Sequence, residues 1–325
     1  MPPPRTIPLD ASTYFALEGP PRRLRERLNI TVTGQAFPPY VEDLAADWVA
    51  SVATPAFKAL AARRGPGRSG AFCSIGTGTG LDALGAAEIF EATRIGITDL
   101  HDEVVAAAAR NIRDNLRDAS GLSLLAGTGD LLAPLAAEAP RFDVIYENLP
   151  NVPIGDPAQL EEGRTSSSFV PPRTEPVPPG LGAALLTLHY LALVQARPLL
   201  APGGAVLSML GARVPLQVFL AMSREAGFRP SFLTYGWKVQ AEADEVLSGH
   251  AGLQRQGLGP FHFHRVEDLE RVFAGLSPEA AALRAEELEA ALAPHRLDAE
   301  AALAAWRRGA RVGHTYAVLL SELAP

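Results

Sequence analysis

The sequence predicts an α/β protein in which a mostly parallel sheet is covered by helices on both faces. Three observations support this fold class. Short apolar runs alternate with helical stretches between Ala71 and Trp237. The first run leads directly into a glycine-rich turn and then a helix. Polar residues follow several of the runs, at the edge of a parallel sheet where ligands usually bind.

Composition narrows the choice of partners. The chain has 325 residues, of which 47% are hydrophobic, enough for one catalytic domain with appendages. Its net charge of −7 lacks the basic excess of nucleic-acid enzymes, so we expect no nucleic-acid partner. No stretch has the apolar length of a signal peptide or membrane span, so we expect no membrane partner. Cys73 is the only cysteine, which fits a cytoplasmic location.

The pattern divides the chain into three parts. Residues 1–68 are expected to form an N-terminal helical or lid segment, with helices over 41–64 that Thr54-Pro55 separates. Residues 69–268 are expected to form the catalytic domain. Residues 269–325 are rich in Ala, Glu, Leu and Arg, which predicts a helical extension through Glu322 and a possible homodimer.

Within the central part each strand and helix has its own signal. Apolar, β-branched runs predict strands at 71–75, 94–98, 122–126, 142–146, 205–210 and 230–237, with a possible seventh strand at 261–266. Apolar positions at helical spacing predict helices at 81–90, 102–116, 131–138, 181–199 and 215–226.

The strongest motif is the turn Gly76-Thr77-Gly78-Thr79-Gly80 after the first strand. Glycines at alternate positions let a ligand lie against bare backbone, and the following helix N-terminus adds free N–H groups. This spacing differs from the G-x-G-x-x-G of dinucleotide sites. It resembles motif I of class I S-adenosylmethionine (SAM)-dependent methyltransferases. The resemblance implies a Rossmann-like fold with a seven-stranded sheet, and SAM as cofactor.

Two further motifs extend the resemblance. It implies that Asp99, after the second strand, binds the SAM ribose hydroxyls through charge-assisted hydrogen bonds. It also implies that Asp130 and the Leu131 backbone bind the adenine. Thr77 belongs to the loop around the amino-acid part of SAM. The family usually carries Asp or Glu two residues before the first loop glycine, whereas this chain has Ser74.

The fourth strand ends in Tyr146-Glu147-Asn148-Leu149-Pro150-Asn151. This resembles a variant of the Asn-Pro-Pro-Tyr motif of methyltransferases that act on planar nitrogens. In that family the Asn orients the acceptor nitrogen toward the methyl group. The resemblance places Asn148 at the reaction centre and next to SAM, and Asn151 in place of the aromatic residue. Without that aromatic, DNA adenine is not expected as the substrate.

Other candidates are read from position alone. His189 and Tyr190 lie on the apolar 181–199 helix, where both could simply face the core. His189, Tyr190 and Glu147 are candidate bases, and Tyr146 or Tyr190 could contact the SAM sulfonium. Gln35, Phe37 and Tyr40 are candidate lid or substrate contacts. The Pro-rich stretch 151–180 is a candidate substrate lid. His262 and His264 lack a further ligand, so no metal is expected.

Three functions remain open. The first is methyl transfer from SAM to nitrogen or oxygen of a small molecule, as in natural-product biosynthesis. The second is a SAM cyclase or lyase that forms an azetidine or cyclopropane amino acid and releases methylthioadenosine. Ser74 in place of the acid makes this second reaction less remote. The third is a non-catalytic SAM-binding module, against which the ordered series of motifs argues.

Overall fold

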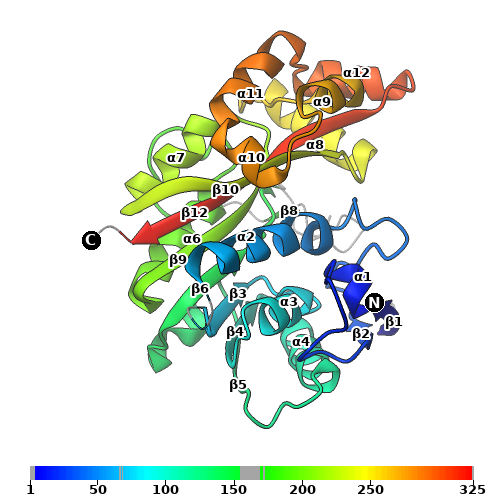
Figure 1. The fold of residues 1–325 in the computed structure, drawn as a ribbon. Coiled ribbons are helices and arrows are strands. Elements are labelled where there is room, and N and C mark those ends of the chain that lie inside the picture. The colour runs from blue at the N-terminus through cyan, green and yellow to red at the C-terminus, as the bar shows by residue number, and fades with distance from the viewer. Residues whose placement is uncertain (1–3, 66, 68, 154–168, 171–172, 324–325) are drawn as a thin grey trace.

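The computed structural model describes residues 4–65, 67, 69–153, 169–170 and 173–323. An eight-stranded sheet lies at its centre, with seven strands in one continuous path (Figure 1). In spatial order these are β10 (Phe228–Val239), β12 (Val312–Leu323), β9 (Leu200–Ala212), β6 (Phe142–Glu147), β3 (Ala71–Ile75), β4 (Arg94–Asp99) and β5 (Ser123–Thr128). Only β12 runs antiparallel to its neighbours on this path. The predicted Rossmann-like α/β fold class is confirmed.

The position of the last strand corrects the sequence analysis. The helical prediction through Glu322 is wrong over Val312–Leu323, because β12 is a buried strand between β9 and β10. Its side chains alternate, with Ala317 and Leu319 in one core and Val318 and Leu320 in the other. The candidate seventh strand at 261–266 is reduced to β11 (His264–Arg265), which pairs with the start of β12.

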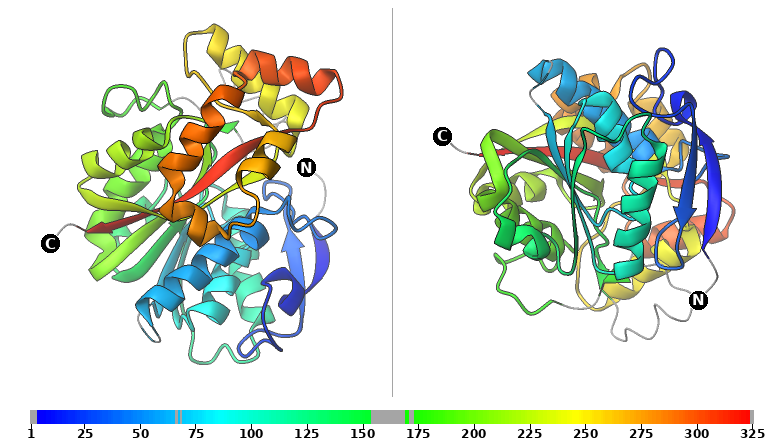
Figure 2. Two further views of the ribbon diagram at one scale, coloured as in Figure 1. Left: turned by 45° about the horizontal axis from the view of Figure 1, so that its top comes forward. Right: turned by 90° about the horizontal axis from the view of Figure 1, so that it is seen from below.

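Helices cover both faces of the sheet (Figure 2). One face carries α2 (Thr54–Arg64), α3 (Leu81–Ile89) and α4 (Asp102–Asn115), with a π-helical turn, η1 (Val49–Ala53), before α2. The other carries η2 (Ala133–Glu138), α6 (Thr187–Ala196), η3 (Arg197–Leu199), α7 (Leu216–Glu225), α9 (Val266–Val272), α10 (Pro278–Leu283), α11 (Ala285–Leu292) and η4 (Ala293–His295). Beyond the sheet, α8 (Ala243–Arg255) packs on α12 (Ala299–Arg307).

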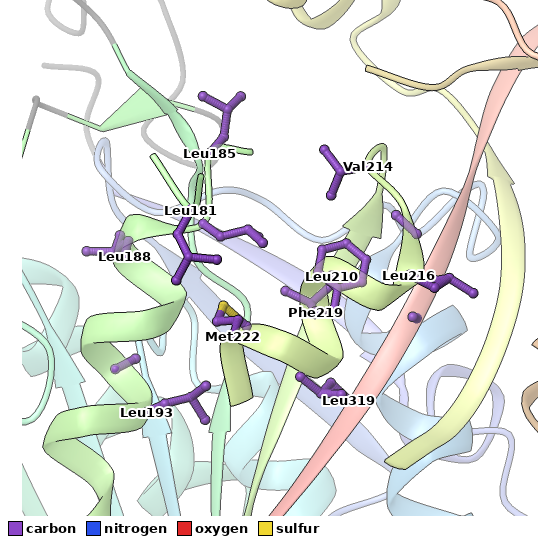
Figure 3. Packing of buried hydrophobic residues seen from close by; sticks show 14 of the residues in the cluster. Leu181, Leu185, Leu188, Leu193, Leu210, Val214, Leu216, Phe219, Met222 and Leu319 are labelled. Carbon is purple, nitrogen blue, oxygen red and sulfur yellow. The ribbon is translucent and has the colours of Figure 1, made fainter. Parts of the chain in front are cut away.

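Apolar side chains of α6 and α7 cover part of one face of the sheet. Leu193 of α6 and Phe219 and Met222 of α7 belong to the same buried apolar cluster as Leu210 of β9 and Leu319 of β12 (Figure 3). The helix begins at Thr187 rather than at the predicted Leu181, because 181–186 forms a turn closed by the bond from Leu186 N to Leu181 O. Burying each of these large side chains contributes about 2 kcal/mol.

The N-terminal segment contains a hairpin that the sequence analysis did not predict. Strands β1 (Arg5–Asp10) and β2 (Arg27–Val32) pair antiparallel, with the short helix α1 (Ala11–Tyr14) between them. Two amides of α4 fasten the hairpin: Thr31 N donates to Asn111 Oδ1 (2.9 Å), and Asn29 N donates to Asn115 Oδ1 (2.7 Å). This attachment positions the following segment, 33–49, beside the carboxyl edge of the sheet. A separate two-stranded ladder pairs β7 (Val152–Pro153) with β8 (Phe169–Val170).

Candidate functional site

A cavity of about 860 Å³ lies at the carboxyl edge of the sheet. Segments that follow β3, β4, β5, β6, β9 and β10 form its wall, together with parts of 35–49, α6 and α8. This edge is where ligands bind in open α/β sheets. Most residues predicted for the site lie in the wall, namely Gln35, Phe37, Tyr40, Gly76, Thr77, Gly78, Asp99, Asp130, Leu131, Tyr146, Asn148, Asn151 and His189. Ser74, Gly80, Glu147 and Tyr190 do not.

The glycine loop presents bare backbone to this cavity. Gly76, Gly78 and Gly80 all have positive φ, at 66°, 51° and 80°, a conformation that favours glycine. A Cβ on Gly78 would meet nothing within 4 Å, so this position is open. A Cβ on Gly80 would lie 3.3 Å from the Ala108 carbonyl oxygen. Gly80 therefore serves close packing of α3 on α4. Gly78 is open to the cavity, and a Cβ on Gly76 would lie 3.2 Å from Leu149 Cδ2, in the same cavity wall.

Asp82, in the first turn of α3, is an acid that the sequence analysis did not select. It lies in the cavity wall yet is only 3% exposed. The Ser74 hydroxyl donates to its Oδ2, the Thr77 hydroxyl to Oδ1 (3.2 Å), and the Ala83 N–H to Oδ1 (2.7 Å). Burial raises the pKa of Asp82 to about 6, against these hydrogen bonds, which lower it. Among the described residues no Lys, Arg or His forms an ion pair with it.

Asp99 lies at the end of β4 beside the same loop. Its Oδ2 accepts a hydrogen bond from Gly78 N (3.2 Å), and its Oδ1 accepts one from His101 N (3.3 Å). Burial raises the pKa of this carboxyl, which the two backbone donors partly offset. The bond to Gly78 ties the end of β4 to the glycine loop.

Asp130 also reaches the cavity, but its carboxylate already has a partner. Arg173 donates from Nη1 to Oδ1 (2.6 Å) and from Nη2 to Oδ2 (3.0 Å), in a bidentate ion pair. The hydrogen bonds from Arg173 hold the pKa of Asp130 below its usual value. Leu131 follows with φ of 49°, which turns the chain at the cavity wall. Arg173 was not among the residues predicted for the site. Much of the candidate lid, at 154–168 and 171–172, lies outside the described residues.

A buried acid–imidazole pair lies where β6 meets α6. His189 Nδ1 lies 2.9 and 3.0 Å from the two carboxylate oxygens of Glu147. Glu147 is fully buried, and His189 is 2% exposed and belongs to the cavity wall. Glu147 therefore fixes the ring orientation of His189, because a carboxylate accepts the Nδ1 proton. The neighbouring Tyr190 is instead packed against the hydrophobic core and does not reach the cavity.

Tyr146 and the residues after it form the floor. The Tyr146 ring is buried and packs edge-on against Phe57, with centroids 5.4 Å apart. Asn148 and Asn151 follow in the cavity wall. Ser74, two positions before the loop, is wholly buried and contacts the cavity only through Asp82.

The N-terminal segment closes one side. The Phe37 and Tyr40 rings pack with centroids 5.4 Å apart. The Tyr40 hydroxyl donates to Glu242 Oε1 (2.7 Å), which links this segment to the one after β10. The candidate lid contacts Gln35, Phe37 and Tyr40 are therefore assembled at the cavity, and their role in binding stays a prediction.

No metal site or membrane helix emerges in the described part of the chain. No group of three or more His, Cys, Asp or Glu side chains there is arranged to hold a metal ion. His264 is buried with its Nδ1 unpaired. No helix among the described residues combines the length and apolar character that crossing a membrane requires.

Comparisons with known proteins give fold-level likeness only. No protein-family model matches the chain, and no curated protein matches its sequence. A Pyrococcus horikoshii protein proposed to be an RNA methyltransferase is 12% identical, with 90% of this chain and 93% of that chain covered and a TM-score of 0.42. The YcgJ protein of Bacillus subtilis is 11% identical (83% and 99% covered, TM-score 0.44). The Thermus thermophilus 16S rRNA N2 G1207 methyltransferase, solved with AdoMet and guanosine, is 16% identical (71% and 49%, TM-score 0.40). Likeness this weak carries no inference about this chain's chemistry.

Proposed function

We propose that this protein is an enzyme that binds SAM and transfers its methyl group to nitrogen or oxygen of a small molecule. One observation carries the proposal. The left-handed glycines Gly76 and Gly78 and the carboxylates of Asp82 and Asp99 meet in the wall of a single cavity. An adenosyl ligand with an amino-acid tail needs these groups together: bare backbone for close approach, one acid for the ribose diol and one for the ammonium.

Each part of SAM has a candidate partner. Asp99, in the cavity wall, would accept hydrogen bonds from the ribose hydroxyls. Asp130 and the Leu131 backbone would hold the adenine, with Arg173 shifting from the carboxylate or stacking beside it. Asp82 would bind the ammonium of the amino-acid tail. It would do so in place of the acid that Ser74 has replaced, because the Ser74 hydroxyl orients this carboxylate from the strand side.

His189 is the candidate general base. When the acceptor lone pair attacks the sulfonium methyl in line, the C–S bond breaks, S-adenosylhomocysteine (SAH) leaves, and the acceptor must lose a proton. Because Glu147 takes the Nδ1 side of His189, the Nε2 lone pair is the one available to accept that proton. Asn148 would orient the acceptor from the end of β6. Glu147 is a positioning residue.

A small acceptor fits the size and walls of the site. The cavity volume lies in the range typical of small-molecule sites, about 300–1,000 Å³. The absence of a nucleic-acid partner and the possible homodimer stay predictions.

The first experiment incubates the purified protein with SAM alone and with pooled small-molecule acceptors, and identifies products by mass spectrometry. SAH that accumulates only with an acceptor supports methyl transfer. Methylthioadenosine and a cyclic amino acid formed from SAM alone would replace it with the cyclase reaction. If calorimetry detects neither SAM nor SAH binding, the proposal fails.

Once an acceptor is known, the base is tested by His189→Ala. General-base catalysis contributes about 100-fold or more, so kcat should fall by at least that factor while the SAH dissociation constant stays within about twofold. Glu147→Gln should lower kcat by a smaller factor, because an amide can still contact the His189 ring but no longer fixes which ring nitrogen carries the proton. An unchanged kcat in His189→Ala would remove His189 from the mechanism. The matched control is Tyr190→Phe, outside the cavity, with unchanged kcat.

A further inference from the structure

The end of the cavity farthest along the sheet from the glycine loop contains a second charged group. It is formed where β9 and β10 end, where β12 begins, and where α8 contributes to the wall. Arg213, Gln240 and His250 lie in this part of the wall. None of them has a part in the SAM site described above.

The Arg213 guanidinium is held firmly but incompletely satisfied. Its Nη2 donates to Gln240 Oε1 (2.9 Å) and lies 3.1 Å from His314 Nε2. Its Nε is buried without a hydrogen-bond partner. The Phe263 ring lies beneath the group, with its centroid 5.8 Å from the guanidinium carbon. Polar neighbours and a ring thus fix its orientation, and donor capacity is left over.

The charge of Arg213 has no counterion. Among the described residues no Asp or Glu lies within ion-pair distance of it. Burial lowers the pKa of Arg213 to about 10, so the group is still charged at neutral pH. Burial and the Arg213 charge also lower the pKa of His250 to about 3 and that of His314 well below its usual value. Both imidazoles are therefore neutral and add no charge beside the guanidinium.

The backbone makes room for this arrangement. A Cβ on Gly211 would come within 2.2 Å of Arg213 Nη1, so only glycine leaves the guanidinium its present position. Arg213 N also donates to Gly211 O (2.8 Å), which folds the end of β9 back on itself. Arg213 is partly buried, and a cation withdrawn from water without a counterion is unfavourable unless a ligand supplies the opposite charge.

We propose that Arg213 and Gln240 form a subsite for a carboxylate of the acceptor, and hence that the acceptor is a small organic acid. The identification of this ligand as the methyl acceptor rests on the proposed function. The preference of the Arg213 subsite for an anionic ligand does not. The single charge of the guanidinium matches a monoanion, because a hydrogen bond from a charged donor to a carboxylate is stronger than one between neutral groups. The wall between Arg213 and the glycine loop includes Trp48 and Met209, which suits an apolar or aromatic body.

The test uses a matched pair of probes, phenylacetate and its neutral amide phenylacetamide, titrated into SAH-saturated protein by calorimetry. The wild type should bind phenylacetate at least about tenfold more tightly than the amide. Arg213→Gln should abolish the difference, and Arg213→Lys should keep part of it. Gly211→Ala should also reduce it, because the Cβ displaces the guanidinium without removing its charge. Arg229→Gln, an exposed arginine of β10, is the matched control and should keep the full preference.

Each other outcome overturns the proposal. Equal or weaker binding of phenylacetate, or no binding of either probe, excludes a carboxylate subsite. If Arg213→Gln weakens SAH but not methylthioadenosine, which lacks the amino-acid tail, Arg213 binds the SAM carboxylate and the acceptor assignment is wrong. Thermal denaturation shows whether Arg213→Gln is folded, and Arg213→Lys serves if it is not. If the wild type does not bind SAH, the proposed function fails; the probe comparison without SAH still decides the charge preference.

Discussion

The two ends of the cavity each contain one charged side chain that lacks an ion-pair partner among the described residues, and the two side chains have opposite charge. At the glycine loop, Asp82 is a buried carboxylate held by hydroxyl and amide donors, and no cation pairs with it among the described residues. Beyond β9, Arg213 is a guanidinium held by an amide and a neutral imidazole, and no acid pairs with it there. At each end, hydrogen bonds fix the position of a charged group that has no counterion among the described residues. A bound ligand would supply that counterion.

This difference in charge between the two ends indicates how one cavity can bind two ligands, each at its own end. A zwitterionic cofactor tail and an anionic acceptor would exchange places only by bringing like charges together, which is strongly unfavourable in a buried site. Four predictions test how far the comparison holds, from the largest expected effect to the smallest.

Asp82→Asn should weaken SAH binding by about 100-fold, because a buried charge-assisted contact to the ligand ammonium is worth about 3 kcal/mol. Methylthioadenosine has no ammonium, so its affinity should not change. Calorimetric titration of both ligands measures the contrast. The matched control is Glu88→Gln on the same helix, whose carboxylate binds the backbone N–H groups of Arg22, Arg23 and Leu24 instead.

The same variant separates a ligand role from a structural one. The pKa of Asp82 is raised in the folded protein, so ionisation of this group disfavours folding above about pH 6. Asp82→Asn should therefore keep or raise the Tm of the ligand-free protein at neutral pH. A lower Tm with equal loss of both ligands would make Asp82 merely structural.

Acidification should reproduce that contrast in the wild type. Asp82 takes up a proton as the pH falls through about 6, so the SAH dissociation constant should rise by up to about tenfold per pH unit below that value. The titratable side chains around Asp82 are Tyr14, Tyr146 and Cys73, and burial raises the pKa of each, so all stay neutral. Methylthioadenosine affinity and the Asp82→Asn variant should show no such step. A step in both ligands would point to another group.

Asp99→Asn should weaken SAH and methylthioadenosine equally, by about tenfold, because both carry the ribose that this carboxylate would bind. The equal loss distinguishes the ribose end from the ammonium end of the same wall. Parallel titrations of the two ligands decide it. A loss confined to SAH would place the amino-acid tail at Asp99 and reverse the proposed orientation.

Arg173→Ala should have the smallest effect, a change of at most about fivefold in either affinity. The ion pair with Asp130 is partly exposed, and such pairs are worth about 0–1 kcal/mol. Freeing the carboxylate for the adenine should shift both affinities in the favourable direction. A large loss of affinity would instead make Arg173 a direct ligand contact. Arg117→Ala, whose ion pair with Glu26 lies outside the cavity wall, is the control.

The sequence predicted the positions of the central strands along the chain well, because each ends in polar or glycine residues that interrupt an apolar run. It failed at β12, where the apolar run around Tyr316–Leu320 follows helices and fits either a strand or a buried helix. Only its pairing with β9 and β10, which the sequence does not reveal, makes this segment a strand rather than a helix. The β1–β2 hairpin was missed because its alternation is weak and amides of α4 help to hold it.

The site was partly predictable for a similar reason. The loop glycines and Asp99 carry signals in their spacing from a strand. Asp82 and Arg213 carry none, because their importance depends on what surrounds them: Ser74 at the neighbouring strand end, and a missing Cβ at Gly211. Glu147 and His189 are 42 residues apart in sequence and meet only through packing of α6 on β6.

The strand that lies between β9 and β10 follows both of them in sequence and is separated from β10 by residues 240–311. Without β12, the edges of β9 and β10 that pair with it have no hydrogen-bond partners. Each is an open template for any extended apolar peptide, including the β12 of another molecule. A chain cut before Val312 should lose His314, which contacts the guanidinium of Arg213, and should therefore bind the anionic ligand less tightly. It should also self-associate, because the edges of β9 and β10 are exposed.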